Sequence, residues 1–128
     1  MSVPSAVTSR KILVVDDDDD IRLLLCTILG QAGHEATGSA TGRGALELAR
    51  SEPFDLILLD LHVPDLDAWT FLVRSWEDPK VKKIPVVMVT ASDDNGLAER
   101  AKAWGCRAFL RKPFHPEEVL ATVAAATG

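Results

Sequence analysis

Apolar and polar positions along the chain form two kinds of segment, and each kind predicts a different secondary structure. Short aliphatic runs predict strands, whereas longer stretches with apolar residues three or four positions apart predict helices. The expected strands cover residues 11–16, 34–39, 55–60, 84–90 and 107–112. The expected helices cover residues 19–32, 42–51, 66–77, 94–104 and 115–126. Strands and helices therefore alternate along the whole chain.

Three of the expected strands are apolar on consecutive residues, as in "KILVVD", "DLILLD" and "IPVVMVT". A strand has this pattern when both of its faces are covered, which is typical of a parallel sheet between two layers of helices. The alternation of strands and helices indicates the same architecture. We therefore expect an α/β fold, a (βα)5 doubly wound sandwich.

The apolar stripe of each helix predicts which face packs on the sheet. Arg22 lies off the stripe of the first helix. The stripes are expected at Ile21, Leu24, Leu25, Ile28 and Ala32 in the first helix, at Leu97, Ala101 and Trp104 in the fourth, and at Val119, Leu120, Val123 and Ala124 in the fifth.

Length and composition limit the classes of protein to which the chain can belong. Its 128 residues suit a single domain, which we place at residues 10–128 after a flexible segment at residues 1–9. The net charge of −5 argues against direct binding of nucleic acid. No apolar run approaches the roughly 20 residues needed to cross a bilayer, and no secretory signal is visible, so we expect a cytoplasmic protein with no membrane partner. Cys26 and Cys106 lie among apolar neighbours and are interpreted as reduced core thiols.

Candidate chemistry gathers at the carboxyl ends of the expected strands, where ligands bind in doubly wound folds. The first strand ends in Asp16 and Asp17, the third in Asp60, the fourth in Thr90 and the fifth in Lys112. Neighbouring carboxylates repel one another unless a cation is present. Mg2+ prefers a few carboxylates together with water and phosphate, so the acids predict a site for this ion.

The other strand-end groups extend this site toward phosphate chemistry. The Lys112 ammonium and the Thr90 hydroxyl are suited to hold phosphoryl oxygens. Asp60, on the central strand, is the best candidate for a nucleophile, because a carboxylate can form an acyl phosphate. Within the run "VVDDDDD", Asp18 is expected to cap the first helix, and Asp19 and Asp20 to occupy its first turn.

Four motifs in this order resemble the receiver domain of bacterial two-component response regulators. They are "VVDDD", "LLDLHVPDLD", "VMVTA" and "FLRKPF", and the resemblance covers about residues 10–126. It implies a flavodoxin-like fold with five parallel strands in the order 2-1-3-4-5. It also implies a signalling switch in a phosphorelay rather than a turnover enzyme. Such a switch catalyses only its own phosphorylation and dephosphorylation.

The resemblance assigns a role to each strand-end residue. Asp60 would be the phosphoacceptor, and Mg2+, with Mn2+ as a substitute, would be bound by Asp17, Asp60 and the backbone carbonyl of His62. Asp16 would act through metal-bound water. The remaining implied roles are phosphoryl binding by Thr90 and Lys112, switching by Thr90 and Phe109, and a cis peptide bond between Lys112 and Pro113.

The implied partners are a sensor histidine kinase or phosphotransfer protein as phosphate donor and a downstream effector. The effector would bind the face formed by the fourth helix, fifth strand and fifth helix. We expect a stand-alone receiver that is a monomer or a phosphorylation-dependent dimer. Two departures from the family pattern are Ala68, where glycine is usual, and Arg107-Ala108 in place of an acidic pair. If the glycine serves a positive φ, Ala68 would strain the loop.

Two further function classes remain open. Asp16 and Asp18 fit the DxD motif of haloacid-dehalogenase-like phosphohydrolases, although the chain is short for a cap domain. A phosphate-independent pseudo-receiver is the other alternative, against which the complete set of acids, threonine and lysine argues. The His62 ring either faces solvent or modestly affects the rate of phosphoryl transfer. His34 and His115 are expected at the surface, and Trp69, Trp76 and Trp104 are expected to pack between helices.

Overall fold

The computed structural model of the chain describes residues 8–91 and 96–128. Residues 1–7 of the expected flexible segment lie outside the described residues, as do residues 94 and 95 of the expected fourth helix. Among the helices within the described ranges, none is both long enough and apolar enough to cross a lipid bilayer.

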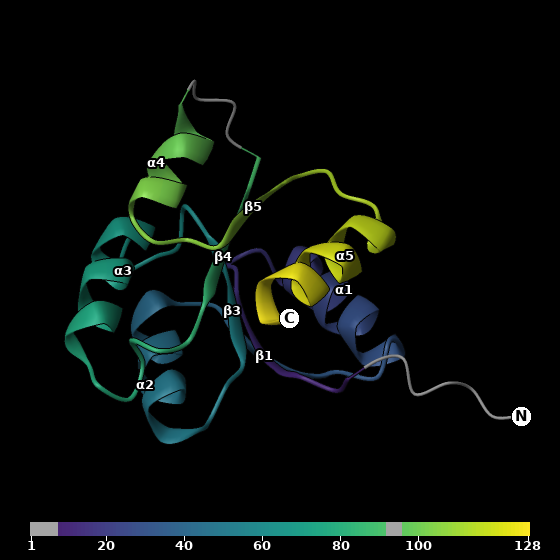
Figure 1. Ribbon diagram of the computed structural model, residues 1–128, viewed down its shortest axis with the longest axis horizontal. Coiled ribbons are helices and arrows are strands. Elements are labelled where there is room, and N and C mark those ends of the chain that lie inside the picture. Colours follow the sequence, from purple (N-terminus) through teal and green to yellow (C-terminus); the bar gives the residue numbers. More distant parts are fainter. Residues whose placement is uncertain (1–7, 92–95) are drawn as a thin grey trace, which may run out of the picture.

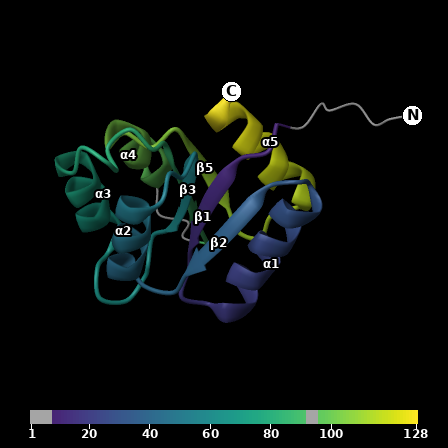
Figure 2. The same ribbon diagram turned by 90° about the horizontal axis from the view of Figure 1, so that it is seen from below.

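The strands form one parallel sheet with the order β2-β1-β3-β4-β5, which confirms the expected topology (Figures 1 and 2). Each strand is followed by a helix, so the βα alternation is also confirmed. The strands are β1 (Lys11–Val15), β2 (Glu35–Ser39), β3 (Leu56–Asp60), β4 (Val86–Thr90) and β5 (Ala108–Arg111).

Helices cover both faces of the sheet (Figure 1). The helices are α1 (Asp19–Gln31), α2 (Gly42–Ser51), α3 (Ala68–Glu77), α4 (Leu97–Ala103) and α5 (Pro116–Thr127). Helices α2, α3 and α4 pack on one face, where their side chains join Leu13, Ile57 and Met88 in one hydrophobic core. Helices α1 and α5 pack on the other, against strand residues such as Ile12 and Leu58. The two cores explain why the central strands are apolar on consecutive residues, because neighbouring residues point to opposite faces.

The register of the sheet brings the carboxyl ends of the central strands to one edge. Val15 is paired with Leu59 between β1 and β3, so Asp16 follows directly beside Asp60. Asp60 is paired with Val89 between β3 and β4, which puts Thr90 one residue further along the same edge. Parallel pairing therefore converts positions distant in sequence into one group of strand ends.

Two helix faces differ from the prediction. In α1, Leu24 is 46% exposed, whereas Leu29, which lies off the expected stripe, is fully buried. In α5, Ala124 is exposed and Ala126 is buried instead. The run of leucines from Leu23 to Leu25 offers more than one apolar stripe, and the docking of α1 beside α5 selects the one centred on Leu25 and Ile28.

Two helix starts also differ. Helix α3 begins at Ala68 rather than at residue 66, because the Asp67 carboxylate accepts a hydrogen bond from the Thr70 N–H at 2.9 Å and caps the helix. Ala68 is buried in the first turn, and Asp65 is the non-glycine residue of the described ranges with positive φ. Ala68 does not have the positive φ on which the expected strain depended, so that strain does not arise here. Helix α4 begins at Leu97, after Gly96 with φ of 83°.

The cysteines and tryptophans largely follow the prediction. Cys106 is a buried free thiol whose pKa is raised by burial to about 11, whereas Cys26 is only half-buried. The Trp104 ring contacts Trp69 and Trp76, with centroids 5.2 and 5.8 Å apart, so the three rings join α3 to the end of α4. Trp76 remains 43% exposed, because its ring packs only at the edge of this cluster.

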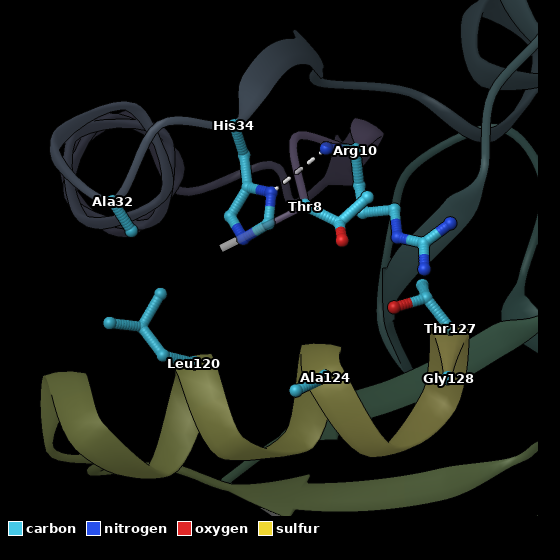
Figure 3. A pocket seen from close by; sticks show the side chains of 8 residues that line it. All are labelled: Thr8, Arg10, Ala32, His34, Leu120, Ala124, Thr127 and Gly128. Atoms are coloured by element: carbon cyan, nitrogen blue, oxygen red, sulfur yellow. Dashed lines mark hydrogen bonds between the residues drawn. The ribbon is translucent and has the colours of Figure 1, made fainter. Parts of the chain in front are cut away.

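His34 is half-buried rather than on the surface, which corrects the expectation, whereas His115 is exposed as expected. The His34 Nδ1 accepts a hydrogen bond from the backbone N–H of Arg10, the residue before β1, at 3.0 Å (Figure 3). Both residues line a cavity of about 300 Å³ between the end of α1 and α5. Burial lowers the pKa of the His34 imidazole, and the nearby Arg10 charge lowers it further.

This hydrogen bond predicts a pH-dependent stability. Because the native pKa of His34 lies below the ordinary value of 6.5, the unfolded chain binds the proton more readily, and the free energy of unfolding should fall as pH drops through that value. His34→Asn keeps a side-chain acceptor that does not titrate. Urea unfolding between pH 7.5 and 5 should show wild type losing stability relative to His34→Asn. A constant difference across this range would contradict the assignment of His34 as a neutral acceptor.

Candidate functional site

Buried polar side chains concentrate at the carboxyl edge of the sheet. Asp60 ends β3, Thr90 ends β4, and Asp16 directly follows β1. Their exposed fractions are 7%, 1% and 1%, although carboxylates and hydroxyls are rarely buried without partners. The buried polar or charged side chains of the described ranges are Asp16, Ser39, Asp60, Ser75 and Thr90. Most of the buried polarity of this fold therefore lies in one place.

Lys112, which follows β5, places its ammonium among these acids. Its Nζ donates to Asp16 Oδ2 at 2.7 Å and to Asp60 Oδ2 at 3.4 Å. Lys112 is 96 positions from Asp16 and 52 positions from Asp60 along the chain, so these contacts exist only when the sheet is complete. The sequence predicts these three residues at one edge, and in the structure they lie in direct contact.

Every polar group of Asp16 is held. Its N–H donates to the Ser39 carbonyl at the end of β2 at 3.1 Å, and its Oδ1 accepts from the Asp18 N–H at 3.0 Å. Its carbonyl accepts from Arg22 Nη1 at 2.8 Å. Neighbours from β2, from α1 and from the loop itself therefore hold Asp16 in place.

The acids fit a divalent cation. Asp16, Asp17 and Asp60 each offer a carboxylate oxygen, and these oxygens lie within 4.8 Å of one another. Among the described residues, the Lys112 ammonium forms ion pairs with Asp16 and Asp60, so the three carboxylates outnumber the cation that contacts them. A hard dication such as Mg2+ can neutralise the remaining negative charge. Asp17 is exposed, so a hydrated ion can reach the group from solvent. The donor set is therefore suited to the ion that the sequence predicts.

The electrostatics of the acids and the lysine are coupled. Burial raises the pKa of the Asp60 carboxyl; the Lys112 charge opposes this rise and the Asp16 charge adds to it. Burial alone would lower the pKa of Lys112, but the hydrogen bond to Asp16 and the charges of Asp60 and Asp16 outweigh it, so that the pKa is raised. Lys112 is therefore cationic at neutral pH.

The remaining predicted residues lie close to this group. The His62 N–H donates to Asp60 Oδ1 at 3.4 Å, and the residue is exposed, as one of the two sequence interpretations expects. Phe109 is half-buried on β5, where it is paired with Met88 of β4. The peptide bond between Lys112 and Pro113 is cis, as the resemblance implies.

The run of aspartates divides as expected. Asp18 caps α1, because its Oδ1 accepts from the N–H groups of Asp20 and Ile21 at 2.9 and 3.1 Å. Asp19 and Asp20 occupy the first turn. The sequence pattern did not identify Arg22 as a residue that contacts this loop, because it indicated only that Arg22 lies off the apolar stripe of the first helix. Its spacing of three residues from Asp19 was the available signal, because acid and base at that spacing pair on a helix.

Known proteins with similar sequences are response regulators. The family model of the response regulator receiver domain matches residues 12–124. A probable chemotaxis protein CheY of Rhizobium etli is 33% identical over 92% of both chains. The polar-differentiation response regulator DivK of Brucella ovis is 30% identical over 94% of this chain and 98% of its own.

Solved structures agree in fold. The chemotaxis response regulator CheY4 of Vibrio cholerae has a TM-score of 0.85 and 33% identity, over 93% of this chain and 99% of its own. The receiver domain of the sensor histidine kinase PA1611 of Pseudomonas aeruginosa has a TM-score of 0.85 and 25% identity, over 94% and 99%. That structure holds a magnesium ion in its active-site cleft.

The coupling of charges predicts the effect of removing the lysine. In metal-free protein, Lys112→Met should raise the pKa of Asp60 further, because the ammonium is the opposing charge among these groups. An NMR titration that follows the side-chain carboxyl carbon measures this pKa. Arg111→Met, which removes a cation from the neighbouring exposed position, serves as the matched control and should change it much less. An Asp60 pKa that is the same in Lys112→Met and wild type would sink this account of the charges.

Proposed function

The chain belongs to the response regulator receiver domain family, and on that premise we propose that it is a phosphorylation switch whose phosphoacceptor is Asp60. The observation that carries this proposal is the group of Asp60, Lys112 and the acids of the loop after β1 at one edge of the sheet. The arrangement supports acceptance of phosphate from a histidine kinase, a phosphotransfer protein or a small acyl phosphate.

The proposed step is an in-line transfer. An Asp60 carboxylate oxygen attacks the phosphorus of a phosphohistidine, a P–O bond forms, and the P–N bond breaks. The departing imidazole keeps the electron pair of the broken bond and takes up a proton. Lys112 and Thr90 would contact the oxygens of the transferring group, where a cation and a hydroxyl donor stabilise negative charge.

The acids would hold Mg2+, or Mn2+ in its place, through Asp17, Asp60 and the His62 backbone carbonyl, with Asp16 supporting the site. When bound, the ion supplies positive charge that neutralises the phosphoryl oxygens. The chain's own contribution is to hold these oxygen ligands together at the end of the sheet. Asp16 is kept in place by Lys112 and by the backbone of Asp18.

The readout would be a change of the α4-β5-α5 face, sensed through Thr90 and Phe109. The position of Phe109 supports this proposal. Thr90 at the end of β4 is paired with Arg111 of β5, and Phe109 lies two residues before Arg111 on the same strand. A downstream effector would bind this face. The protein would act as a switch that modifies itself, not as an enzyme that turns over a separate substrate.

Phosphorylation can be tested directly. Incubation with Mg2+ and acetyl phosphate should give one phosphate-sized adduct in the intact mass of the wild-type protein. The adduct should be absent in Asp60→Asn, which keeps the size of the side chain but removes the nucleophilic carboxylate. An adduct of equal yield in Asp60→Asn would rule out Asp60 as the acceptor.

Two other measurements, of phosphate release and of partner binding, separate the alternatives. Multiple-turnover release of phosphate that needs Asp16 but not Asp60 would indicate a phosphohydrolase, although Asp18, the second acid of its motif, is used here to cap α1. Partner binding that is unchanged in Asp60→Asn and Asp60→Glu would indicate a pseudo-receiver.

Two exposed aspartates give a matched test of the metal site. Asp17→Ala should abolish Mg2+ binding measured by calorimetry, because it removes one of the clustered ligands. Asp20→Ala removes the same charge from the first turn of α1 and should leave the affinity nearly unchanged. Equal losses in the two variants would mean that only general electrostatic attraction is involved.

A further inference from the structure

Arg22 reaches from α1 back to the acidic loop. Its Nη1 donates to the Asp16 carbonyl at 2.8 Å, and its Nη2 contacts Asp19 Oδ1 at 2.6 Å. The Arg22 side chain is 23% exposed, whereas that of Asp19 is 85% exposed. The contact to Asp19 is therefore a solvent-screened surface pair, and the contact to the Asp16 carbonyl is the better protected of the two.

The route of the Arg22 side chain depends on Gly38 of β2. A Cβ added at Gly38 would lie 2.9 Å from Arg22 Cδ, too close for both atoms to keep their places, and 3.1 Å from Cγ, which is a tight contact. The Arg22 stem would therefore have to shift. Gly38 is paired with Val14 of β1, next to the loop that carries the acids. Glycine here leaves the space through which the Arg22 stem passes to the Asp16 carbonyl.

The Asp16 carbonyl is a sensitive point of the metal site. Its carbon is bonded to the Asp17 nitrogen, and the planar peptide bond moves these atoms as one unit. The Asp16 N–H is already held by the Ser39 carbonyl on the side of β2. The N–H belongs to the peptide unit before Asp16 and the carbonyl to the unit after it, so the Asp16 backbone is held on both sides of its Cα. The contact from Arg22 fixes the carbonyl of the peptide plane that leads to Asp17, which limits where the Asp17 carboxylate can lie.

We propose that Arg22 is a positioning residue for the divalent-cation site and that Gly38 is the position that permits its contact. Arg22 does not touch the ion; it acts through the Asp16 carbonyl on the orientation of Asp17. The inference rests on the metal-binding part of the proposed function. It adds a residue on α1 and one on β2, both outside the set of strand-end groups.

The sign of the effect separates this proposal from simple electrostatics. A guanidinium near the acids repels a dication, so its removal by Coulomb's law alone would strengthen Mg2+ binding. Loss of a positioning contact would weaken it instead, and removal of groups that orient metal ligands typically costs about 10–100-fold in affinity.

The first test measures the Mg2+ dissociation constant by calorimetry, without a phosphoryl donor. Arg22→Met keeps the aliphatic stem and should weaken binding by about tenfold or more. Arg22→Lys restores a cationic donor on a similar stem and should recover part of the loss. Circular dichroism and thermal unfolding without Mg2+ establish that each variant is folded. Unchanged or tighter binding in folded Arg22→Met would overturn the proposal.

The second test uses Gly38→Ala, which changes no charged group. It should weaken Mg2+ binding when Arg22 is present, because the new Cβ displaces the Arg22 stem. In Arg22→Ala, which has no stem to displace, Gly38→Ala should leave the affinity unchanged. Equal effects in the two backgrounds would mean that Gly38 acts independently of Arg22. If the Arg22 variants do not fold, Gly38→Ala in the wild-type background decides the matter, and unchanged Mg2+ binding in folded Gly38→Ala would overturn the proposal.

These outcomes are distinct from a failure of the proposed function. Absence of Mg2+ binding in the wild-type protein would contradict the metal site itself. Normal binding in wild type that does not respond to Arg22 or Gly38 would overturn only the positioning role.

Discussion

The site depends on one electrostatic constraint, which is that two buried carboxylates and a partly buried ammonium meet where three strands of the sheet end. Lys112 Nζ lies 2.7 Å from Asp16 and 3.4 Å from Asp60. Removal of such groups from water is costly, and a buried ion pair often adds little net stability. We infer that the group is kept for its chemistry. Burial raises the pKa of Asp60 even with Lys112 beside it, and the Asp16 charge adds to the rise. The three clustered carboxylates are oxygen ligands of the kind that a hard dication prefers.

The fold meets this constraint because it is parallel and covered on both faces. Parallel pairing brings every strand's carboxyl end to the same edge, and the helix layers bury the strands so thoroughly that all residues of β3 are inaccessible up to Asp60. The backbone around Asp16 is then held by neighbours from β2 and α1. The five aspartates divide accordingly: the carboxylates of the first two lie in one group with that of Asp60, the third caps α1, and the last two occupy its first turn.

Much of this arrangement was predictable. The strands and helices were located to within a few residues, because their apolar periodicity is local. The site residues were identifiable because each directly ends or follows a strand, and a doubly wound fold gathers those positions. The errors occurred where several local solutions were equivalent. Three consecutive leucines in α1 leave its buried face undetermined, and the start of α3 depended on whether Asp67 acts as a cap.

The sequence by itself therefore determined the order of elements, the parallel sheet and the identity of the groups at its carboxyl edge, since these follow from short-range patterns. Only the tertiary structure decided that Lys112 lies closer to Asp16 than to Asp60, and that Arg22 passes over Gly38 to hold the Asp16 carbonyl. It likewise decided that His34 accepts a hydrogen bond from the backbone of Arg10. Such contacts join residues that are distant along the chain, and their geometry depends on how helices and strands dock, which no local pattern encodes.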